Sequence, residues 1–155
     1  MASTLTASTM TVTISESITL NGKNQGGTQT LSIPSIATVS RRIIDVPASE
    51  VEIIAMSTAV ASGTFIESDV LYIRITNLDD TNHVTLLFKN EDNDEFAVKL
   101  DKGQTFIYNG DLSGGVVDTM DADSSALSVG LGDLVNITAT ADTAACDVEV
   151  FVACK

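Results

Sequence analysis

One histidine and two cysteines are the side chains best suited to nucleophilic or metal chemistry. His83 lies beside a predicted turn, and no G-x-S-x-G segment accompanies it. Cys146 and Cys154 fall in one predicted strand, whose rise of about 3.3 Å per residue separates them by roughly 26 Å. A disulfide needs Cα atoms within about 7 Å, so these two cannot bond each other there. We therefore expect no catalytic residue, no zinc site and no cofactor.

Acidic turns are the other candidate for ligand chemistry. Asp79-Asp80 and the run from Glu91 to Glu95 both lie between predicted strands, where carboxylates can supply the oxygen ligands that calcium prefers. Neither run matches the D-x-[DN]-x-[DN]-G loop with its distal glutamate. We interpret both as solvated turns, assign no metal ligand, and leave calcium binding as an open alternative.

Arg41-Arg42 is the one pair of adjacent basic residues. Neighbours on a strand point to opposite faces, so the two guanidinium groups have different surroundings. We expect a salt bridge, with Glu16 as one candidate carboxylate, and a contact with another protein as the alternative. Four residues are the candidate partner contacts of the chain, namely Leu5, Met10, Arg41 and Arg42.

Composition narrows the possible function classes. The 155 residues include 21 acidic and 8 basic side chains, for a net charge of −13, and 44% are hydrophobic. Affinity for nucleic acid and anionic membranes comes from clustered lysine and arginine, so neither is an expected partner. No run reaches the roughly 18 apolar residues of a membrane helix, and the N-terminus lacks the features of a secretory signal. The length favours one soluble domain.

Alternation of apolar and polar residues is the main structural signal, and it predicts strands throughout. The strands are expected near 9–20, 29–33, 36–46, 51–60, 70–76, 84–88, 96–100, 104–109, 134–141 and 146–153. Short polar turns between 70 and 109 favour an antiparallel meander. We expect an all-β fold, an antiparallel β-sandwich for which a jelly roll is one topology, with residues 1–8 as an N-terminal arm and 9–155 as a single sandwich domain.

Two details accompany this fold. Residues 110–132 read as a long loop, with one helical turn near residues 121–127. Cys146 and Cys154 share a face with three valines of the last strand, so we expect both to be small buried core residues. An intermolecular disulfide or a reactive thiol is the alternative.

Three segments carry a resemblance to a known group of proteins. They are TMTVTISESITLNGKNQG (9–26), SDVLYIRITNLDDTNHVTLLFKNEDNDEFAVKLDKGQTFIYN (68–109) and ADTAACDVEVFVA (141–153). Each resembles small virion structural proteins of marine, cyanophage-like tailed bacteriophages. The resemblance implies a virion component and brings no catalytic residues with it.

Charge and fold then favour one role within a virion. An acidic protein suits the outer surface of a capsid, because the DNA inside would repel it. We expect a non-enzymatic decoration or cement protein that binds the major capsid protein and self-associates as a trimer or other homo-oligomer. The N-terminal third is nearly neutral, so it should face the shell while the acidic loops face solvent. A tail, neck or fibre component that binds the host surface is the alternative. A carbohydrate-binding sandwich is another, although the chain has no Trp and only two Tyr to stack on sugars.

Overall fold

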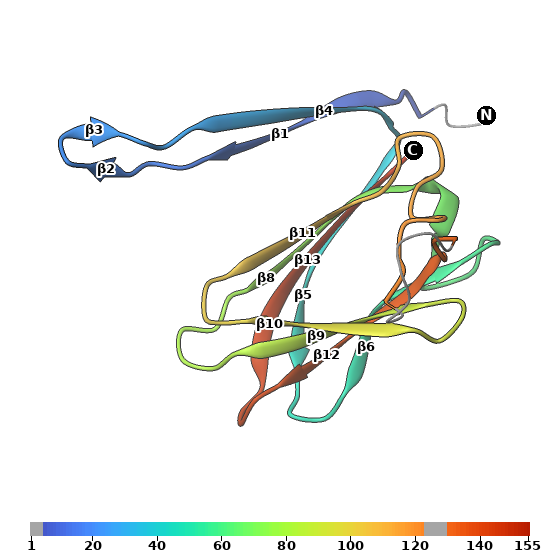
Figure 1. Ribbon diagram of the computed structural model, residues 1–155. Helices are drawn as coiled ribbons and strands as arrows, with labels where there is room; N and C mark the ends of the chain where they lie inside the picture. The colour runs from blue at the N-terminus through green and yellow to red at the C-terminus, as the bar shows by residue number, and fades with distance from the viewer. Residues whose placement is uncertain (1–4, 123–129) are drawn as a thin grey trace.

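Two packed sheets form the body of the protein, and a long β-hairpin projects from one end of it (Figure 1). The computed structural model describes residues 5–122 and 130–155. The expected helical turn near 121–127 and the start of the N-terminal arm therefore fall mostly outside the described residues. The fold is all-β, as the sequence predicts, and the described residues include a short 3-10 helix at Glu67–Asp69. Within the described ranges, no helix is long and apolar enough to cross a membrane.

The two sheets of the body contain nine strands. The first sheet has the order β11 (Thr105–Asn109), β8 (Val70–Asn77), β13 (Cys146–Cys154) and β5 (Thr38–Val46). The second has the order β10 (Glu95–Leu100), β9 (Val84–Asn90), β12 (Leu134–Ala141), β6 (Val51–Ser57) and the two-residue β7 (Phe65–Ile66). All neighbours are antiparallel except β6 and β7. The predicted antiparallel β-sandwich is confirmed.

The predicted meander is wrong, although its four strands are present. β8 pairs with β11, and β9 pairs with β10, so the chain crosses between the sheets after β8 and again after β10. The pairing is nested: β5 with β13, β6 with β12, β8 with β11 and β9 with β10. A polar turn of given length can close a hairpin or turn a sandwich corner, so turn spacing did not reveal the crossing. At this corner, buried Asn77 donates its side-chain N–H bonds to the carbonyls of Asn82 and Leu100 and so ties two loops together.

Apolar side chains from both sheets fill the space between them. Phe88 lies at the centre, with its ring centroid 4.7 Å from that of Phe96 and 5.1 Å from that of Phe106. The long loop after β11 also contributes to this core through its buried Val116 and Met120. Cys146 and Cys154 are free and buried there, as expected. Burial raises the pKa of the Cys154 thiol to about 11, so this residue stays a neutral packing group.

The N-terminal strands lie outside the sandwich. β1 (Ser8–Ser15) pairs only with β4 (Thr28–Ile36), and β2 (Thr19–Leu20) pairs with β3 (Lys23–Asn24) at the tip. The two-sheet body therefore begins at β5 rather than near residue 9. Asn21 and Gly22 close the tip with φ values of 50° and 75°, the pair of positive angles that an Asn-Gly hairpin turn requires.

Candidate functional site

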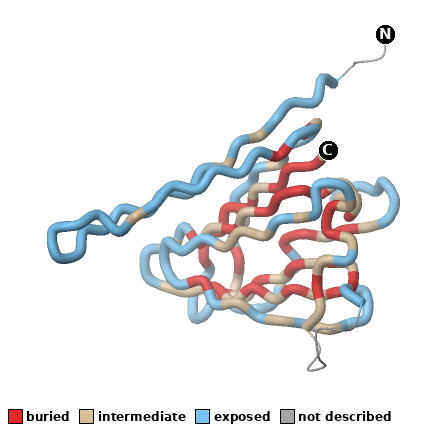
Figure 2. The backbone as a smooth tube through the Cα atoms, turned by 45° about the horizontal axis from the view of Figure 1, so that its top comes forward, coloured by how far each residue is buried: buried red, intermediate tan, exposed pale blue. Residues whose placement is uncertain are grey.

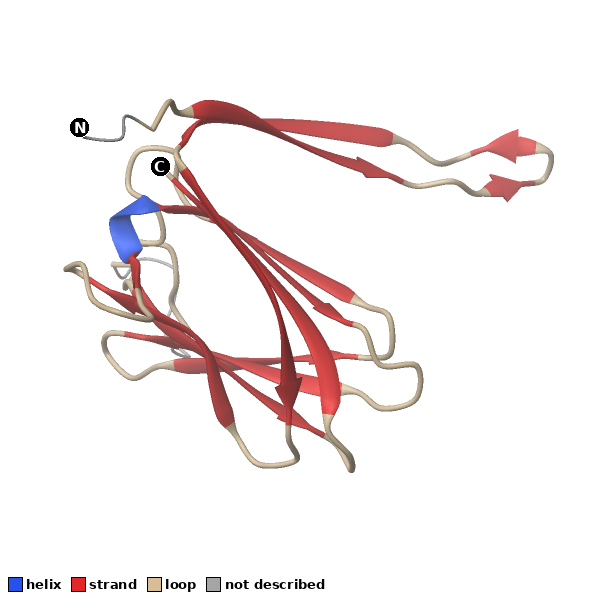
Figure 3. Cartoon of the chain, turned by 180° about the vertical axis from the view of Figure 1, so that it is seen from behind, coloured by secondary structure: helices blue, strands red, loops and turns tan. Residues whose placement is uncertain are grey.

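Among the residues that the structure describes, the hairpin packs on the body at its base. Ile33 and Ile36 of β4 are buried against Leu71, Tyr72 and Ala153 of the first sheet. Met10 and Val12 of β1 pack on the edge of this cluster. Beyond the base the hairpin is largely exposed, as Figure 2 shows, and the view from behind shows it diverging from the sheet (Figure 3). The hairpin is thus anchored at one end and free at the other.

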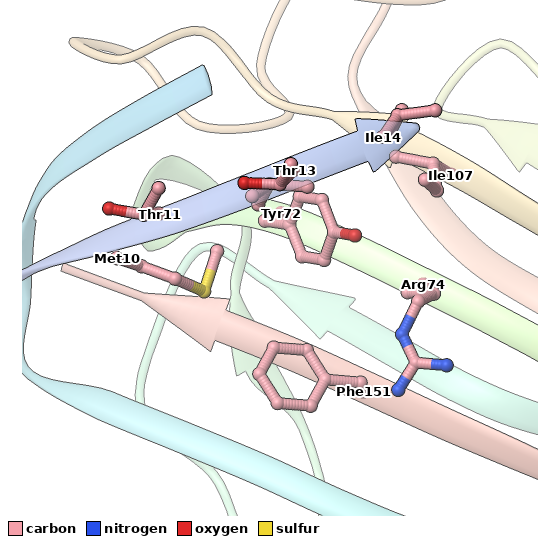
Figure 4. A pocket seen from close by; sticks show the side chains of 9 residues that line it. Met10, Thr11, Thr13, Ile14, Tyr72, Arg74, Ile107 and Phe151 are labelled. Atoms are coloured by element: carbon pink, nitrogen blue, oxygen red, sulfur yellow. The ribbon is translucent and has the colours of Figure 1, made fainter. Parts of the chain in front are cut away.

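A cleft of about 390 Å³ lies between the hairpin and the outer face of the first sheet. The hairpin side is lined by residues of β1, and the sheet side by Tyr72, Arg74, Ile107 and Phe151 (Figure 4). A second hollow of about 260 Å³ lies beside it, towards β4. The aromatic floor is ordered: the rings of Tyr72 and Phe151 meet edge to face at 6.0 Å. Tyr72 is buried beneath the hairpin, whereas Phe151 is only half-buried.

A charge network stands beside this floor. Arg41 Nε donates to Glu149 Oε2 at 2.8 Å, and Arg74 Nη2 donates to Glu149 Oε1 at 2.5 Å. Arg74 also lies 5.7 Å from the centroid of the Phe151 ring. The Glu149 side chain is only 7% exposed. The bonds from Arg41 and then Arg74 hold the pKa of this carboxyl below its usual range, so Glu149 is charged and fixed in place.

The predicted salt bridge of the arginine pair forms, but the candidate carboxylate, Glu16, is wrong. Arg41 forms the predicted salt bridge, but with Glu149 rather than Glu16, which lies in the hairpin with its backbone N–H bonded to the Gly27 carbonyl. Glu149 is 108 residues away from Arg41 in the chain, and sequence analysis missed it because nothing local marks the pair. Arg42 points the other way, as alternation predicts, and donates to the Ile53 carbonyl of the second sheet.

The four candidate contact residues fall in different places. Met10 lines the cleft, and Arg41, whose side chain is 68% exposed, joins the network beside it. Leu5 is exposed ahead of β1. Arg42 makes the bond to Ile53 described above. Tyr72 and Arg74 were not candidates, although alternation in β8 placed both on the face opposite Ile73.

One face of the hairpin is apolar along its length, buried at the base and, among the described residues, exposed towards the tip. In the β1–β4 register, Met10 opposes Ile33 and Val12 opposes Leu31, while threonine and serine occupy the other face. Further out, four large apolar side chains are about half exposed: Ile14, Ile18, Leu20 and Leu31. A two-stranded hairpin alone is marginally stable in water. The arrangement is suited to binding another protein surface.

The histidine and cysteine do not form a catalytic arrangement. His83 Nδ1 lies 3.5 Å from the Asp142 carboxylate. The Cys146 thiol contacts the backbone carbonyls of His83 and Ala144 rather than the imidazole ring, and burial raises its pKa. A buried neutral thiol is a poor nucleophile.

The carboxylate of Asp79, in the first acidic turn, forms hydrogen bonds with the backbone of its own turn. The Asp79 carboxylate accepts the backbone N–H groups of Thr81 and Asn82, and these bonds lower its pKa. Among residues 5–122 and 130–155, no three His, Cys, Asp or Glu side chains are grouped so that they could hold a metal ion.

Comparison with known proteins gives no further assignment. No protein-family model, no curated protein and no solved structure matches the chain.

Proposed function

We propose that this chain is a non-enzymatic virion structural protein of a tailed bacteriophage, a decoration protein that binds the outer surface of the capsid shell through its N-terminal hairpin. The single observation that carries the proposal is the projecting hairpin, whose apolar face continues past the body without cover. Leu20, near the tip, is 54% exposed. Such a face fits a groove or sheet on a neighbouring coat subunit.

Charge supports the same orientation. Residues 1–36 contain one acid, Glu16, and one base, Lys23, so the hairpin is neutral and the whole charge of −13 belongs to the remainder. A neutral apolar surface can approach another protein without repulsion, whereas the acidic body favours solvent over packaged DNA. The likeness of residues 9–26, 68–109 and 141–153 to phage virion proteins supports the same class of function.

The topology agrees with this class. The nested pairing of eight strands is consistent with a jelly roll, an architecture that occurs in viral capsid proteins and in lectins. Fold does not by itself assign function, so the proposal depends on the hairpin and not on the sandwich. A protein that binds only the assembled shell stabilises it by mass action.

The test uses phage particles that lack the chain and are supplied with purified protein. Wild-type protein should bind and delay DNA release on heating. The variant Leu20→Lys should remain folded, because the side chain is exposed, but should neither bind nor protect. Val60→Lys is the matched control, since Val60 is also exposed but lies on the body, and it should behave like wild type.

Copy number separates the shell from other locations in the particle. Many copies, in proportion to the coat protein, agree with decoration of the shell. A few copies per particle would instead place the chain in the tail or neck and contradict the proposal. DNA release at the same temperature with and without the protein would contradict a stabilising role.

A further inference from the structure

β5 is an open edge of the first sheet. Among residues 5–122 and 130–155, its nine residues pair with β13 on one side and with no strand on the other. The cleft beneath the hairpin is lined from β8, β11 and β13 but not from β5. Val39 and Ile43 on its outer face are exposed, Ile43 by 60%. An edge strand presents unpaired backbone N–H and C=O groups that a strand of another chain can use. Exposed apolar residues on such an edge suggest that it is covered in the working assembly.

Unbalanced charge lies on the same strand. Asp45 stands directly opposite Asp147 in the β13–β5 register, and neither carboxylate has an ion pair among the described residues. Like charges opposite each other destabilise a sheet. A cation beyond the free edge of β5 would relieve this repulsion, and Arg41 lies on the same strand and face as Asp45, four residues before it.

We propose that two copies of this chain pair antiparallel through their β5 edges, across a two-fold axis that passes through Ile43. Residues directly opposite in an antiparallel pair share a face. With the axis at Ile43, this residue meets Ile43 of the second copy. Arg41 then lies opposite Asp45 of the second copy, and symmetry repeats that contact. The centre of the seam therefore joins one apolar pair and two oppositely charged pairs.

Neighbouring registers lack this complementarity. An axis at Arg42 places the Arg42 side chains of the two copies opposite each other, and an axis at Arg41 does this for the two Arg41 side chains. Both registers bring like charges together. An axis at Ile44 places Ile43 opposite Asp45 and leaves Arg41 without a carboxylate. Among these registers, only the axis at Ile43 joins opposite charges.

The pairing has a geometric consequence for the hairpins. The two-fold axis runs perpendicular to the sheet, so the outer faces of both copies stay on the same side. Both hairpins then project from one face of a continuous eight-stranded sheet. Once one hairpin of the dimer has bound a shell, binding of the other hairpin is intramolecular and therefore more favourable. The self-pairing itself does not depend on the proposed binding to a capsid.

The test measures the mass of the full chain in solution, by sedimentation over low to high micromolar concentrations. Wild type should form dimers. Arg41→Asp and Asp45→Arg each place two like-charge contacts in the seam and should weaken the dimer at least tenfold. A one-to-one mixture of these two variants should dimerise again, because both contacts then join an acid and a base. The double variant should also dimerise.

Controls keep the outcome interpretable. Lys99→Asp and Asp92→Arg change the net charge by the same amounts at exposed positions away from β5, and both should dimerise as wild type does. Arg41→Asp also loses the bond to Glu149, so its unfolding curve is measured as well. Asp45→Arg breaks no ion pair of the part of the chain that the structure describes, so it tests the seam by itself. A monomeric wild type would overturn the proposal, as would a mixture that stays monomeric. The proposal would also be overturned if Leu20→Lys abolished the dimer while Asp45→Arg kept it, because the two copies would then associate through the hairpin.

Discussion

Arg74 Nη2 lies 2.5 Å from Glu149 Oε1, and the two residues are on adjacent strands of the first sheet, next to the cleft beneath the hairpin. Arg41 reaches the same carboxylate from the other side, so one acid joins three strands. Because Arg41 is mostly exposed, its share of the stabilisation is reduced by solvent.

Removing the Glu149 charge should destabilise the protein. Glu149→Gln removes the negative charge and leaves one acceptor oxygen for the two arginines. Loss of these charge-assisted bonds should lower the free energy of unfolding by about 1 to 2 kcal/mol at neutral pH. Denaturant unfolding measures this. Glu95→Gln, at the more exposed Lys89–Glu95 pair, is the control and should change stability by less than about 0.5 kcal/mol.

The effect of Glu149 should depend on pH in a defined direction. Its pKa is lowered in the folded protein, so its stabilising contribution is present above the ordinary value of 4.5 and is lost as pH falls through the lowered value. The difference between wild type and Glu149→Gln should therefore shrink in acid. A difference that stays constant from neutral to strongly acidic pH would show that the charge is not responsible.

Glu67 should show the opposite pH dependence. This carboxyl is buried, and desolvation, followed by the charges of Asp133 and Glu91, raises its pKa. The folded protein then binds a proton more tightly than the unfolded chain, so wild type loses stability as pH rises from 4.5 through the raised pKa. Glu67→Gln should raise the melting temperature at neutral pH, and the two proteins should converge in acid. A lower melting temperature for the variant at neutral pH would contradict this account.

Tyr72 should hold the hairpin to the body. Its ring is buried between Phe151 and the base of the hairpin, so Tyr72→Ala should cost about 3 kcal/mol and increase hydrogen exchange in β1 and β4. Tyr72→Phe keeps the ring and should retain most of the stability. Unchanged exchange in the hairpin of the alanine variant would mean that other contacts anchor it.

The hairpin tip should open without unfolding of the sandwich core. Gly22 has a positive φ, and an added Cβ would meet no atom within 4 Å, so Gly22→Ala acts through backbone strain alone, at about 1 kcal/mol. We expect faster hydrogen exchange near the tip and an unchanged melting temperature of the body. Gly130→Ala, which also meets no atom but has no positive φ, is the control. A lower melting temperature of the body would show that hairpin and sandwich unfold together.

Local pattern predicts the strands and their faces but not their partners. Alternation placed Ile73 and Arg74 on opposite faces of β8, since the face of a strand residue follows from its position relative to its neighbours. Which sheet a strand enters depends on corners such as the one at Asn77, whose bonds reach Leu100. The pairing of Arg41 with Glu149 likewise depends on the order of β5, β13 and β8, which no local signal carries.

Cryo-electron microscopy of the intact phage particle tests the central claim most directly. The proposed function predicts density for the chain on the outer surface of the shell, with Ile18 and Leu20 of the hairpin against the coat protein and the acidic loops towards solvent. Density confined to the tail or neck, or a hairpin that points away from the shell into solvent, would contradict it.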